Sequence, residues 1–152
     1  MNVSQTSVRA NDAARIEIRK GVQEMTNEPK FFRCKMCGNL VGLVINGGGT
    51  LVCCGEEMEE LTANAVDAST EKHVPVFEQD GSKVSVKIGS VEHPMVEEHH
   101  IEWIYINTTK GGQRKSLTVG SAPVAEFALA DGEELISVYE FCNLHGLWVA
   151  KA

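Results

Sequence analysis

The chain has 152 residues, of which 43% are hydrophobic, and a formal net charge of -7 at pH 7. This length fits one ordinary domain, or a small module followed by a larger domain. The acidic balance argues against a nucleic-acid-binding protein, which needs a basic surface to neutralise phosphates. No apolar run approaches the ~20 residues that span a bilayer, and the first residues lack the charged-then-apolar order of a secretory signal. We therefore expect a cytoplasmic protein that binds neither nucleic acid nor membrane.

Residues 1–30 form an extension whose pattern does not choose between helix and strand. Apolar side chains between residues 18 and 25 would share one helix face, whereas the alternation over residues 15–19 suits a short strand. The segment is expected to end near Pro29, because the residue before a proline avoids helical geometry.

Five cysteines divide into a group of four and a single one: Cys34, Cys37, Cys53, Cys54 and Cys142. An odd number in a cytoplasmic chain fits poorly with a disulfide framework, since thiols there stay reduced. The division predicts two separate sites.

Residues 31–66 are interpreted as a small module held together by a metal. The motif Cys34-x2-Cys37 and the adjacent pair Cys53-Cys54 each stand beside a glycine, and an apolar run with a glycine-rich turn separates them. Such a module is too small to fold by apolar burial alone. Four thiolates suit zinc or a single iron. Adjacent cysteines must splay apart, and this distortion favours a redox iron over a structural zinc.

The acidic stretch 56–70 is interpreted as a linker with a boundary near residue 66, and residues 67–152 as an all-β domain. Apolar residues recur with period two over short runs separated by turn residues: 84–88, 101–106, 115–119, 125–129, 135–141 and 147–150. Strands at this spacing predict an antiparallel sandwich, with a small closed barrel as the alternative.

All of the histidines lie in this second domain, together with the isolated cysteine: His73, His93, His99, His100 and His145. His99 and His100 cannot both reach one centre from an extended chain, because successive side chains point to opposite faces. The pattern alone does not choose between them. Several neutral imidazoles with one thiolate suit a redox iron, and a blue-copper site with Met95 as a weak ligand is the alternative.

Glu71 and Lys72 directly precede His73. An acidic chain repels small anions, so an anionic substrate requires a local positive charge to attract it. Lys72 is placed to supply that charge and to stabilise a bound anion.

Together these motifs resemble one family, the superoxide reductases of the two-iron desulfoferrodoxin type. Residues 31–66 resemble desulforedoxin through the four cysteines. Residues 67–152 resemble neelaredoxin through four segments: Glu71-Lys72-His73-Val74-Pro75, His93-Pro94-Met95, His99, and Cys142-Asn143-Leu144-His145. The resemblance favours His99 over His100. It implies an immunoglobulin-like antiparallel β-sandwich behind a small, metal-bound, desulforedoxin-like β module.

The resemblance also implies iron at both centres and a set of roles. Ferrous iron at the second centre would reduce superoxide by one electron to hydrogen peroxide. Lys72 would attract superoxide, and Glu71 would occupy the sixth position of the oxidised state. The implied ligands are four equatorial histidines and an axial cysteine: His73, His93, His99, His145 and Cys142.

The partners implied are superoxide, a rubredoxin-like electron donor and a second copy of the chain in a homodimer. The four-cysteine iron would be a relay or a structural centre. An alternative from another class is a rubredoxin-like electron carrier whose histidine site holds a structural or storage metal. A purely structural zinc protein is the third candidate.

Overall fold

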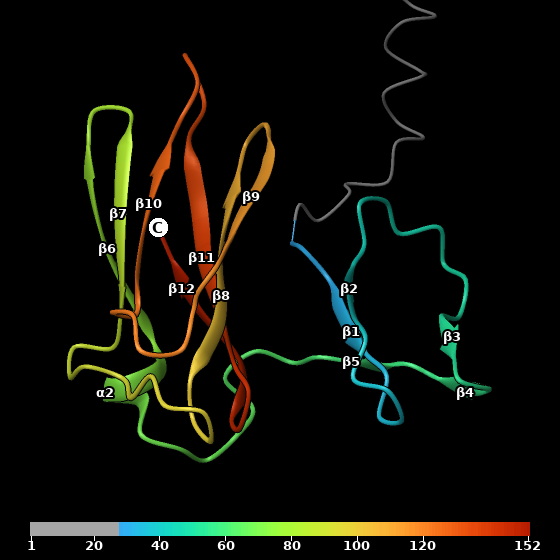
Figure 1. The fold of residues 1–152 in the computed structure, drawn as a ribbon. Helices are drawn as coiled ribbons and strands as arrows, with labels where there is room; N and C mark the ends of the chain where they lie inside the picture. The colour runs from blue at the N-terminus through green and yellow to red at the C-terminus, as the bar shows by residue number, and fades with distance from the viewer. Residues whose placement is uncertain (1–27) are drawn as a thin grey trace, which may run out of the picture.

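The computed structural model describes residues 28–152, and the helix-or-strand alternatives for the N-terminal extension lie outside them. Two parts lie side by side in Figure 1, a small module and a larger two-sheet sandwich. Strands account for nearly all of the regular structure, as the all-β prediction requires. Within residues 28–152 no helix has the length and apolar character that crossing a bilayer demands.

The small module consists of two antiparallel pairings that present cysteines at their turns. A three-stranded sheet has the order β2-β1-β5, and a separate hairpin joins β3 to β4. The strand bounds are β1 Phe31–Arg33, β2 Leu40–Gly42, β3 Val52–Cys53, β4 Glu56–Glu57 and β5 Glu59–Glu60. The predicted linker therefore contains two short strands, because β5 pairs with β1 and belongs to the module sheet. The domain boundary near residue 66 stays a prediction.

The larger part is an antiparallel sandwich with one sheet of order β10-β7-β6 and another of order β12-β11-β8-β9. The two sheets do not join, so the closed-barrel alternative is wrong. The elements are α2 Thr70–His73, β6 Pro75–Asp80, β7 Lys83–Ile88, β8 Ile101–Thr108, β9 Gly111–Ser116, β10 Val124–Ala128, β11 Leu135–Cys142 and β12 Gly146–Lys151.

Two strand predictions need correction. The strand expected over residues 115–119 lies earlier, at Gly111–Ser116, because the two glycines read as a turn are the first residues of β9 and pair with β8. The strand β6 was missed altogether. Its exposed, acidic second half hides the alternation, although every residue of β6 pairs with β7.

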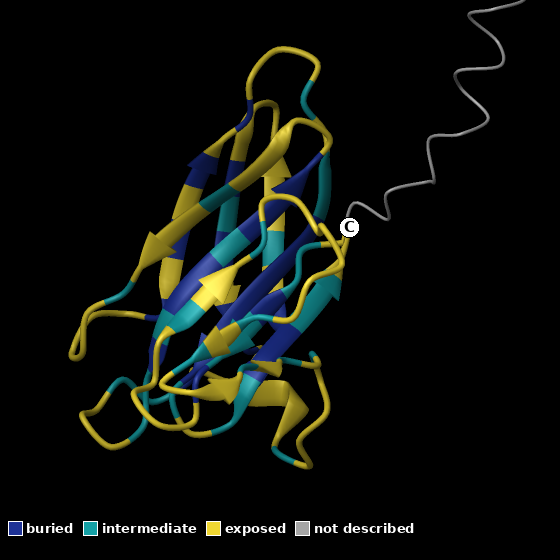
Figure 2. Cartoon of the chain, turned by 90° about the vertical axis from the view of Figure 1, so that its right-hand side faces the viewer, coloured by how far each residue is buried: buried dark blue, intermediate teal, exposed yellow. Residues whose placement is uncertain are grey.

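Alternation along β11 sends side chains to two different cores. Val138 and Cys142 pack between the two sheets, in the cluster that includes Ile104 of β8. Tyr139 and Phe141 point to the opposite face and form a second cluster with residues of the small module. Figure 2 shows the buried residues as bands along the sandwich strands. Cys142 is the last of the β11 residues whose side chains point between the sheets. The strand therefore places this thiol at the end of the sandwich where α2 lies.

Candidate metal centres

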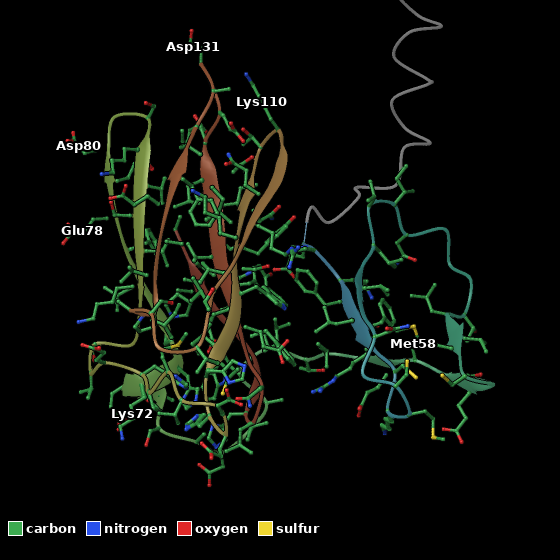
Figure 3. The ribbon with its side chains drawn as sticks, in the orientation of Figure 1. Met58, Lys72, Glu78, Asp80, Lys110 and Asp131 are labelled. Carbon is green, nitrogen blue, oxygen red and sulfur yellow. The ribbon has the colours of Figure 1, made fainter. Side chains whose placement is uncertain are left out.

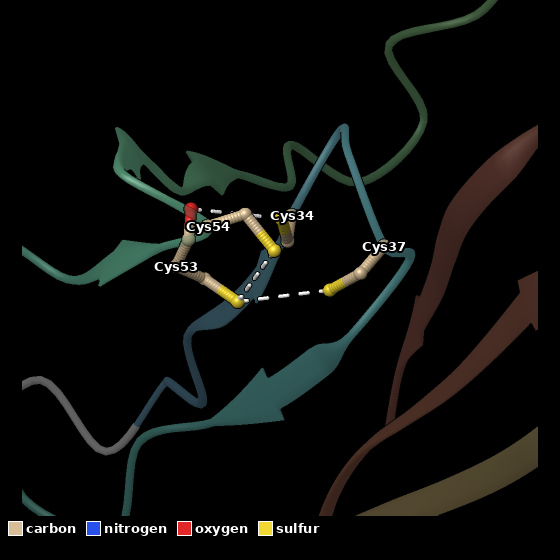
Figure 4. Close-up of side chains that lie close together, drawn as sticks. All are labelled: Cys34, Cys37, Cys53 and Cys54. Carbon is tan, nitrogen blue, oxygen red and sulfur yellow. Dashed lines mark hydrogen bonds between the residues drawn. The ribbon is translucent and has the colours of Figure 1, made fainter.

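The four cysteines of the small module meet at one point. Their sulfur atoms lie within 4.8 Å of one another, and Figure 4 shows them converging from the turn after β1 and the turn after β3. The Sγ atoms of Cys37 and Cys53 are 3.6 Å apart, and those of Cys53 and Cys54 are 3.9 Å apart. A tetrahedral centre with metal–sulfur bonds of ~2.3 Å places its sulfurs roughly 3.8 Å from each other. The residues present therefore fit a single metal ion.

Cys54 shows how two adjacent cysteines reach the same point. Its φ of 53° lies in the left-handed region, which costs a residue with a side chain about 1–2 kcal/mol. This conformation turns the Cys54 side chain back toward that of Cys53, and Gly55 follows with a φ of 83°. The backbone conformation at Cys54 thus lets two adjacent cysteines direct their sulfur atoms to one metal site.

Without a bound cation, the four thiols of this cluster cannot all be ionised near neutral pH. The pKa of Cys34 is lowered to about 7, chiefly because the backbone N–H of Cys37 donates to its sulfur. The pKa of Cys54 is raised to about 12, first through its hydrogen bond with the Cys37 side chain. Four thiolates in contact repel one another unless a cation lies between them, and a bound metal removes that repulsion.

The second cluster lies at the end of the sandwich beside α2. Ligand atoms of His73, His93, His99 and Cys142 all lie within 4.8 Å of one another. His145 joins them, because its Nδ1 is 3.0 Å from His73 Nε2, 3.1 Å from His99 Nε2 and 3.7 Å from Cys142 Sγ. His93 Nε2 is 3.2 Å from His73 Nε2. All five predicted ligands are therefore gathered at one point.

The histidine nitrogens have the spacing of a ligand plane. Metal–nitrogen bonds of ~2.1 Å at right angles separate neighbouring nitrogens by roughly 3.0 Å, and three edges of the histidine ring measure 3.0, 3.1 and 3.2 Å. His93 and His99 complete the ring with centroids 4.4 Å apart. Cys142 stands as the fifth donor beside this ring.

Backbone carbonyls set which nitrogen of two histidines faces the centre. His73 Nδ1 lies 2.8 Å from the carbonyl of Ser69, and His93 Nδ1 lies 2.6 Å from that of Pro94. Each Nδ1–H donates to its carbonyl, so each Nε2 carries a lone pair, and these two lone pairs face each other. Such an arrangement is repulsive without a cation between the rings, and it is the usual support for a metal-bound imidazole.

Burial favours the neutral form of His73, His93 and His99, and the neutral imidazole is the form that binds a metal. Desolvation lowers the pKa of His93 to about 4 and is also the largest cause of the lowered pKa values of His73 and His99. Burial likewise raises the pKa of Cys142, while the backbone N–H groups of His145 and Leu144 act in the opposite direction.

His100 lies outside this cluster. Its Nδ1 is 3.0 Å from the carbonyl of Val96, and its backbone N–H donates to Asn143 Oδ1. Met95, the ligand that a blue-copper site would need, packs against the sandwich core, and its sulfur accepts the backbone N–H of Ile101. The donor set therefore lacks the methionine of the copper alternative.

The helix α2 presents Glu71 and Lys72 beside His73, with both side chains exposed. In Figure 3, Lys72 extends from α2 at the lower end of the sandwich. Burial is the largest cause of the lowered pKa values of His73 and His99, and the Lys72 charge is the smallest of the named causes for both. The ammonium is thus within electrostatic reach of two of the rings.

A close approach at Gly89 holds α2 in place. Val91 N–H donates to the Glu71 carbonyl at 3.0 Å. A Cβ on Gly89, whose φ is +78°, would lie 2.7 Å from the Lys72 carbonyl oxygen, 2.8 Å from that of Glu71 and even closer to that of Val91. Only glycine allows the loop to come this near.

Gly89→Ala is therefore expected to displace α2 and destabilise the protein. The matched control is Gly81→Ala, because Gly81 also has a positive φ, of +58°, but open space around the missing Cβ. The overpacking at Gly89 should cost about 1–3 kcal/mol beyond the control. Chemical denaturation of both variants measures the difference. Equal free energies of unfolding would show that the close approach at Gly89 does not hold α2 in place.

Three supporting residues were not anticipated from the sequence. The Trp148 ring stacks on His73 with centroids 4.8 Å apart. Asn143 connects the end of β11 to the loop before β8. Its side chain accepts a hydrogen bond from His100 N–H and donates one to the Glu98 carbonyl. Glu140 is fully buried, in register with Trp148. The burial of Glu140 could have been predicted from the strand alternation, because Val138, Glu140 and Cys142 lie on one face of β11.

Glu140 is expected to make stability depend on pH. Burial raises its pKa well above the ordinary 4.5, so the folded state favours the neutral acid. The stability this provides is complete below the unfolded pKa and is lost as pH rises toward the folded one. Glu140→Gln should therefore remove this loss of stability above about pH 4.5. Near neutral pH the free energy of unfolding of the variant should exceed that of the wild type by about 1–3 kcal/mol.

Urea unfolding of the metal-loaded protein across the range from about pH 5 to 8 measures this effect. Glu78→Gln, at an exposed glutamate on β6, is the control and should keep the wild-type dependence. A Glu140→Gln variant with that same dependence would rule the explanation out.

The fold and the two donor sets define a class: a two-domain β metalloprotein that joins a four-thiolate centre to a histidine–thiolate centre. The family model described as "Desulfoferrodoxin" matches residues 65–151, and that described as "Desulfoferrodoxin, N-terminal domain" matches residues 26–61. The chain belongs to the desulfoferrodoxin family. With both donor sets present, it has two iron centres, one in each domain.

Several related proteins match this sequence over most of its length. A desulfoferrodoxin homolog of Archaeoglobus fulgidus is 45% identical over 82% of this chain and 98% of its own length. A desulfoferrodoxin of Syntrophotalea carbinolica is 45% identical over 84% and 99%. Among solved structures, a superoxide reductase from Treponema pallidum matches with a TM-score of 0.70 and 43% identity, over 82% of this chain and 99% of that one.

Proposed function

We propose that this chain is a superoxide reductase, which reduces superoxide by one electron to hydrogen peroxide at the histidine–cysteine centre. The observation that carries the proposal is the ring of imidazole nitrogens with 3.0–3.2 Å edges and the Cys142 sulfur beside it. The Treponema pallidum protein, a superoxide reductase by name, shares the fold over nearly its whole length.

The proposed iron ligands are the residues that the two clusters bring together. Cys34, Cys37, Cys53 and Cys54 would hold one iron. The other would be held by four histidines and one cysteine: His73, His93, His99, His145 and Cys142. Iron in this second donor set supplies a one-electron couple whose reactivity is tuned by the thiolate.

The residues around the histidine ring have distinct proposed tasks. Lys72 attracts the superoxide anion toward an otherwise acidic surface and stabilises it there. It also organises the water that delivers protons, since forming hydrogen peroxide from superoxide takes two protons with the electron. Glu71, exposed on the same helical turn, would supply a carboxylate oxygen to the iron when it is oxidised.

Stopped-flow mixing of the reduced protein with superoxide tests the function directly. We expect rapid second-order oxidation of the histidine-site iron, seen as growth of its absorption band. A rubredoxin-like electron carrier, the alternative function, would show no rapid oxidation at that centre. Metal analysis on the same sample separates a third possibility, because a structural zinc protein would be colourless.

A small one-electron carrier of the rubredoxin type is the proposed donor that restores the reduced state. The proposed setting is the cytoplasm, where the reaction would serve detoxification of superoxide. Both clusters need reduced thiols, and the five cysteines are all unpaired within residues 28–152. A reducing compartment meets that need.

A homodimer is proposed through the loop that follows β2 in the small module. Val44 is 95% exposed and Ile45, next to it in the chain, is 71% exposed, which is unusual for adjacent apolar side chains on a small monomer. A second copy offering the same loop would bury them symmetrically. Sedimentation velocity should give the mass of two chains, and Ile45→Glu should give one. A monomeric wild type would contradict the proposal.

A further inference from the structure

We propose that Asn46 is a site of spontaneous deamidation, in which the backbone nitrogen of Gly47 attacks the Asn46 side-chain amide and a carboxylate replaces it. The loop between β2 and β3 carries this asparagine on the side of the small module away from the sandwich (Figure 1). The effect of the modification on the association of two chains rests on the homodimer proposed above. The modification itself does not.

Asn46 is the one asparagine in the sequence that a glycine follows. Attack on the side-chain amide closes a succinimide ring, and a side chain on the following residue hinders that approach. Glycine removes the obstacle and lets the backbone reach the conformations that ring closure requires. The sequence therefore makes Asn46 the most reactive asparagine of the chain.

The structure leaves the reacting groups open to solvent. Residues 46–50 are all exposed. Apart from the neighbours of Gly47 in the chain, no atom lies within 4 Å of the position that a Cβ on this glycine would take. Within residues 28–152 the Gly47 N–H donates no hydrogen bond to the protein. The attacking nitrogen is thus free to lose its proton to water.

One hydrogen bond prepares the Asn46 amide for attack. The Gly48 N–H donates to Asn46 Oδ1 at 3.0 Å, and this turn holds the side chain over the backbone that follows it. A donor on this oxygen stabilises the negative charge that develops there when a nucleophile adds to Cγ. The loop therefore lowers the barrier to the first step of the reaction.

Two other asparagines in the described part of the chain provide internal references. Asn64 and Asn143 each use both polar side-chain atoms in hydrogen bonds to distant parts of the chain. Each of them precedes a residue with a side chain. Ring closure at either position requires those hydrogen bonds to break first, so both should react more slowly than Asn46.

The reaction needs no reagent except water. The Gly47 nitrogen forms a bond to Asn46 Cγ, and the bond from Cγ to Nδ2 breaks to release ammonia. Water then opens the succinimide at either of its carbonyls and leaves an aspartyl or an isoaspartyl residue. Each modified chain becomes heavier by about 1 Da and gains one negative charge.

The new carboxylate lies beside the exposed apolar pair Val44 and Ile45, which directly precede Asn46. A two-fold contact through this loop brings the same residues of both chains together, so the two added charges face each other. Like charges placed opposite each other at an interface weaken association. Deamidation therefore favours separate chains, whereas pairing covers the loop and protects Asn46.

Peptide mapping by mass spectrometry follows the modification in the full-length protein at mildly alkaline pH. We expect Asn46 to react before Asn64 and Asn143. Its rate should rise with pH, because the attacking nitrogen must lose a proton, and should fall as the protein concentration rises. Gly47→Ala is the matched variant, because its Cβ enters open space, and it should slow the reaction roughly tenfold or more. Equal rates in wild type and Gly47→Ala would overturn the proposed site.

Sedimentation velocity over a concentration series tests the effect on pairing. Asn46→Asp reproduces the charge of the product, and its dimer should dissociate with a constant roughly tenfold above that of fresh wild type. Asn46→Gln should match fresh wild type, and aged wild type should shift toward single chains as its modified fraction grows.

An Asn46→Asp dimer as tight as that of wild type would overturn the link to pairing. So would a monomeric fresh wild type, or a deamidation rate that does not depend on protein concentration. Neither measurement uses the reaction with superoxide, so a failure of this proposal is distinguishable from a failure of the proposed enzymatic function.

Discussion

Cys142→Ser is expected to remove the sulfur-to-iron charge-transfer absorption of the oxidised histidine site and to slow superoxide reduction by roughly 10²-fold or more. The thiol is fully buried at the end of β11, 3.7 Å from His145 Nδ1. It is the only sulfur donor in that cluster among the described residues. Serine keeps the size of the side chain and removes the electron-rich sulfur that tunes the iron.

Cys37→Ser is the matched control, because it removes a thiol from the other centre. It should change the four-cysteine spectrum and leave the charge-transfer band of the histidine site intact. Visible absorption of both oxidised variants, with iron content measured on the same samples, makes the comparison. Survival of the band in Cys142→Ser would show that this thiolate does not bind the histidine-site iron.

Lys72→Ala is expected to lower the second-order rate of the reaction with superoxide by about tenfold at low ionic strength. The chain carries a net charge of -7, so an approaching anion meets a repulsive field that Lys72 offsets locally. Iron content should not change, since Lys72 is exposed and not among the clustered donors. Lys72→Arg should keep most of the rate because the positive charge remains.

Lys110→Ala provides the positional control, since Lys110 lies at the far end of the sandwich from Lys72 in Figure 3. It removes the same charge from the molecule as a whole. Added salt should slow the wild-type reaction and affect Lys72→Ala less, because screening weakens only the attraction that is still present. An equal loss of rate in both alanine variants would mean that net charge, not local steering, governs the approach.

Much of the fold was predictable because its signals are local. Period-two alternation found the positions of β7, β8, β10, β11 and β12, and the glycines between them marked turns. The pattern failed where burial does not alternate. Only Pro75 among the residues of β6 is buried, so the pairing of β6 with β7 leaves little trace in the sequence. In β9 the pairing depends on partners in β8 that no local pattern reveals.

The composition of the two clusters was predictable because metal-binding residues are chemically distinctive and unevenly distributed. The choice of His99 over His100 came only from the family resemblance, since the chain turns at this point and simple alternation does not apply. The register between β8 and β11 shifts where Phe141 pairs with Trp103 and Cys142 with Ile101, which leaves Glu102 as an extra residue at the start of β8, just after the two histidines. Such irregularities depend on tertiary contacts.

The supports of the histidine site could not be predicted in the same way. Ser69 acts through its backbone carbonyl, and any residue carries one. Trp148 reads as an ordinary core residue until its stacking on His73 is seen. Gly89 reads as a turn glycine, although the closeness of the α2 carbonyls is what excludes every other residue.

The central claim is that this chain reduces superoxide and does not dismute it. The most direct measurement counts the products of one turnover, with the fully reduced protein in excess over superoxide in an anaerobic cell. The account predicts one hydrogen peroxide for each superoxide consumed and no dioxygen, with one histidine-site iron oxidised per event. Release of dioxygen in half the amount of superoxide, with the iron left reduced, would contradict it.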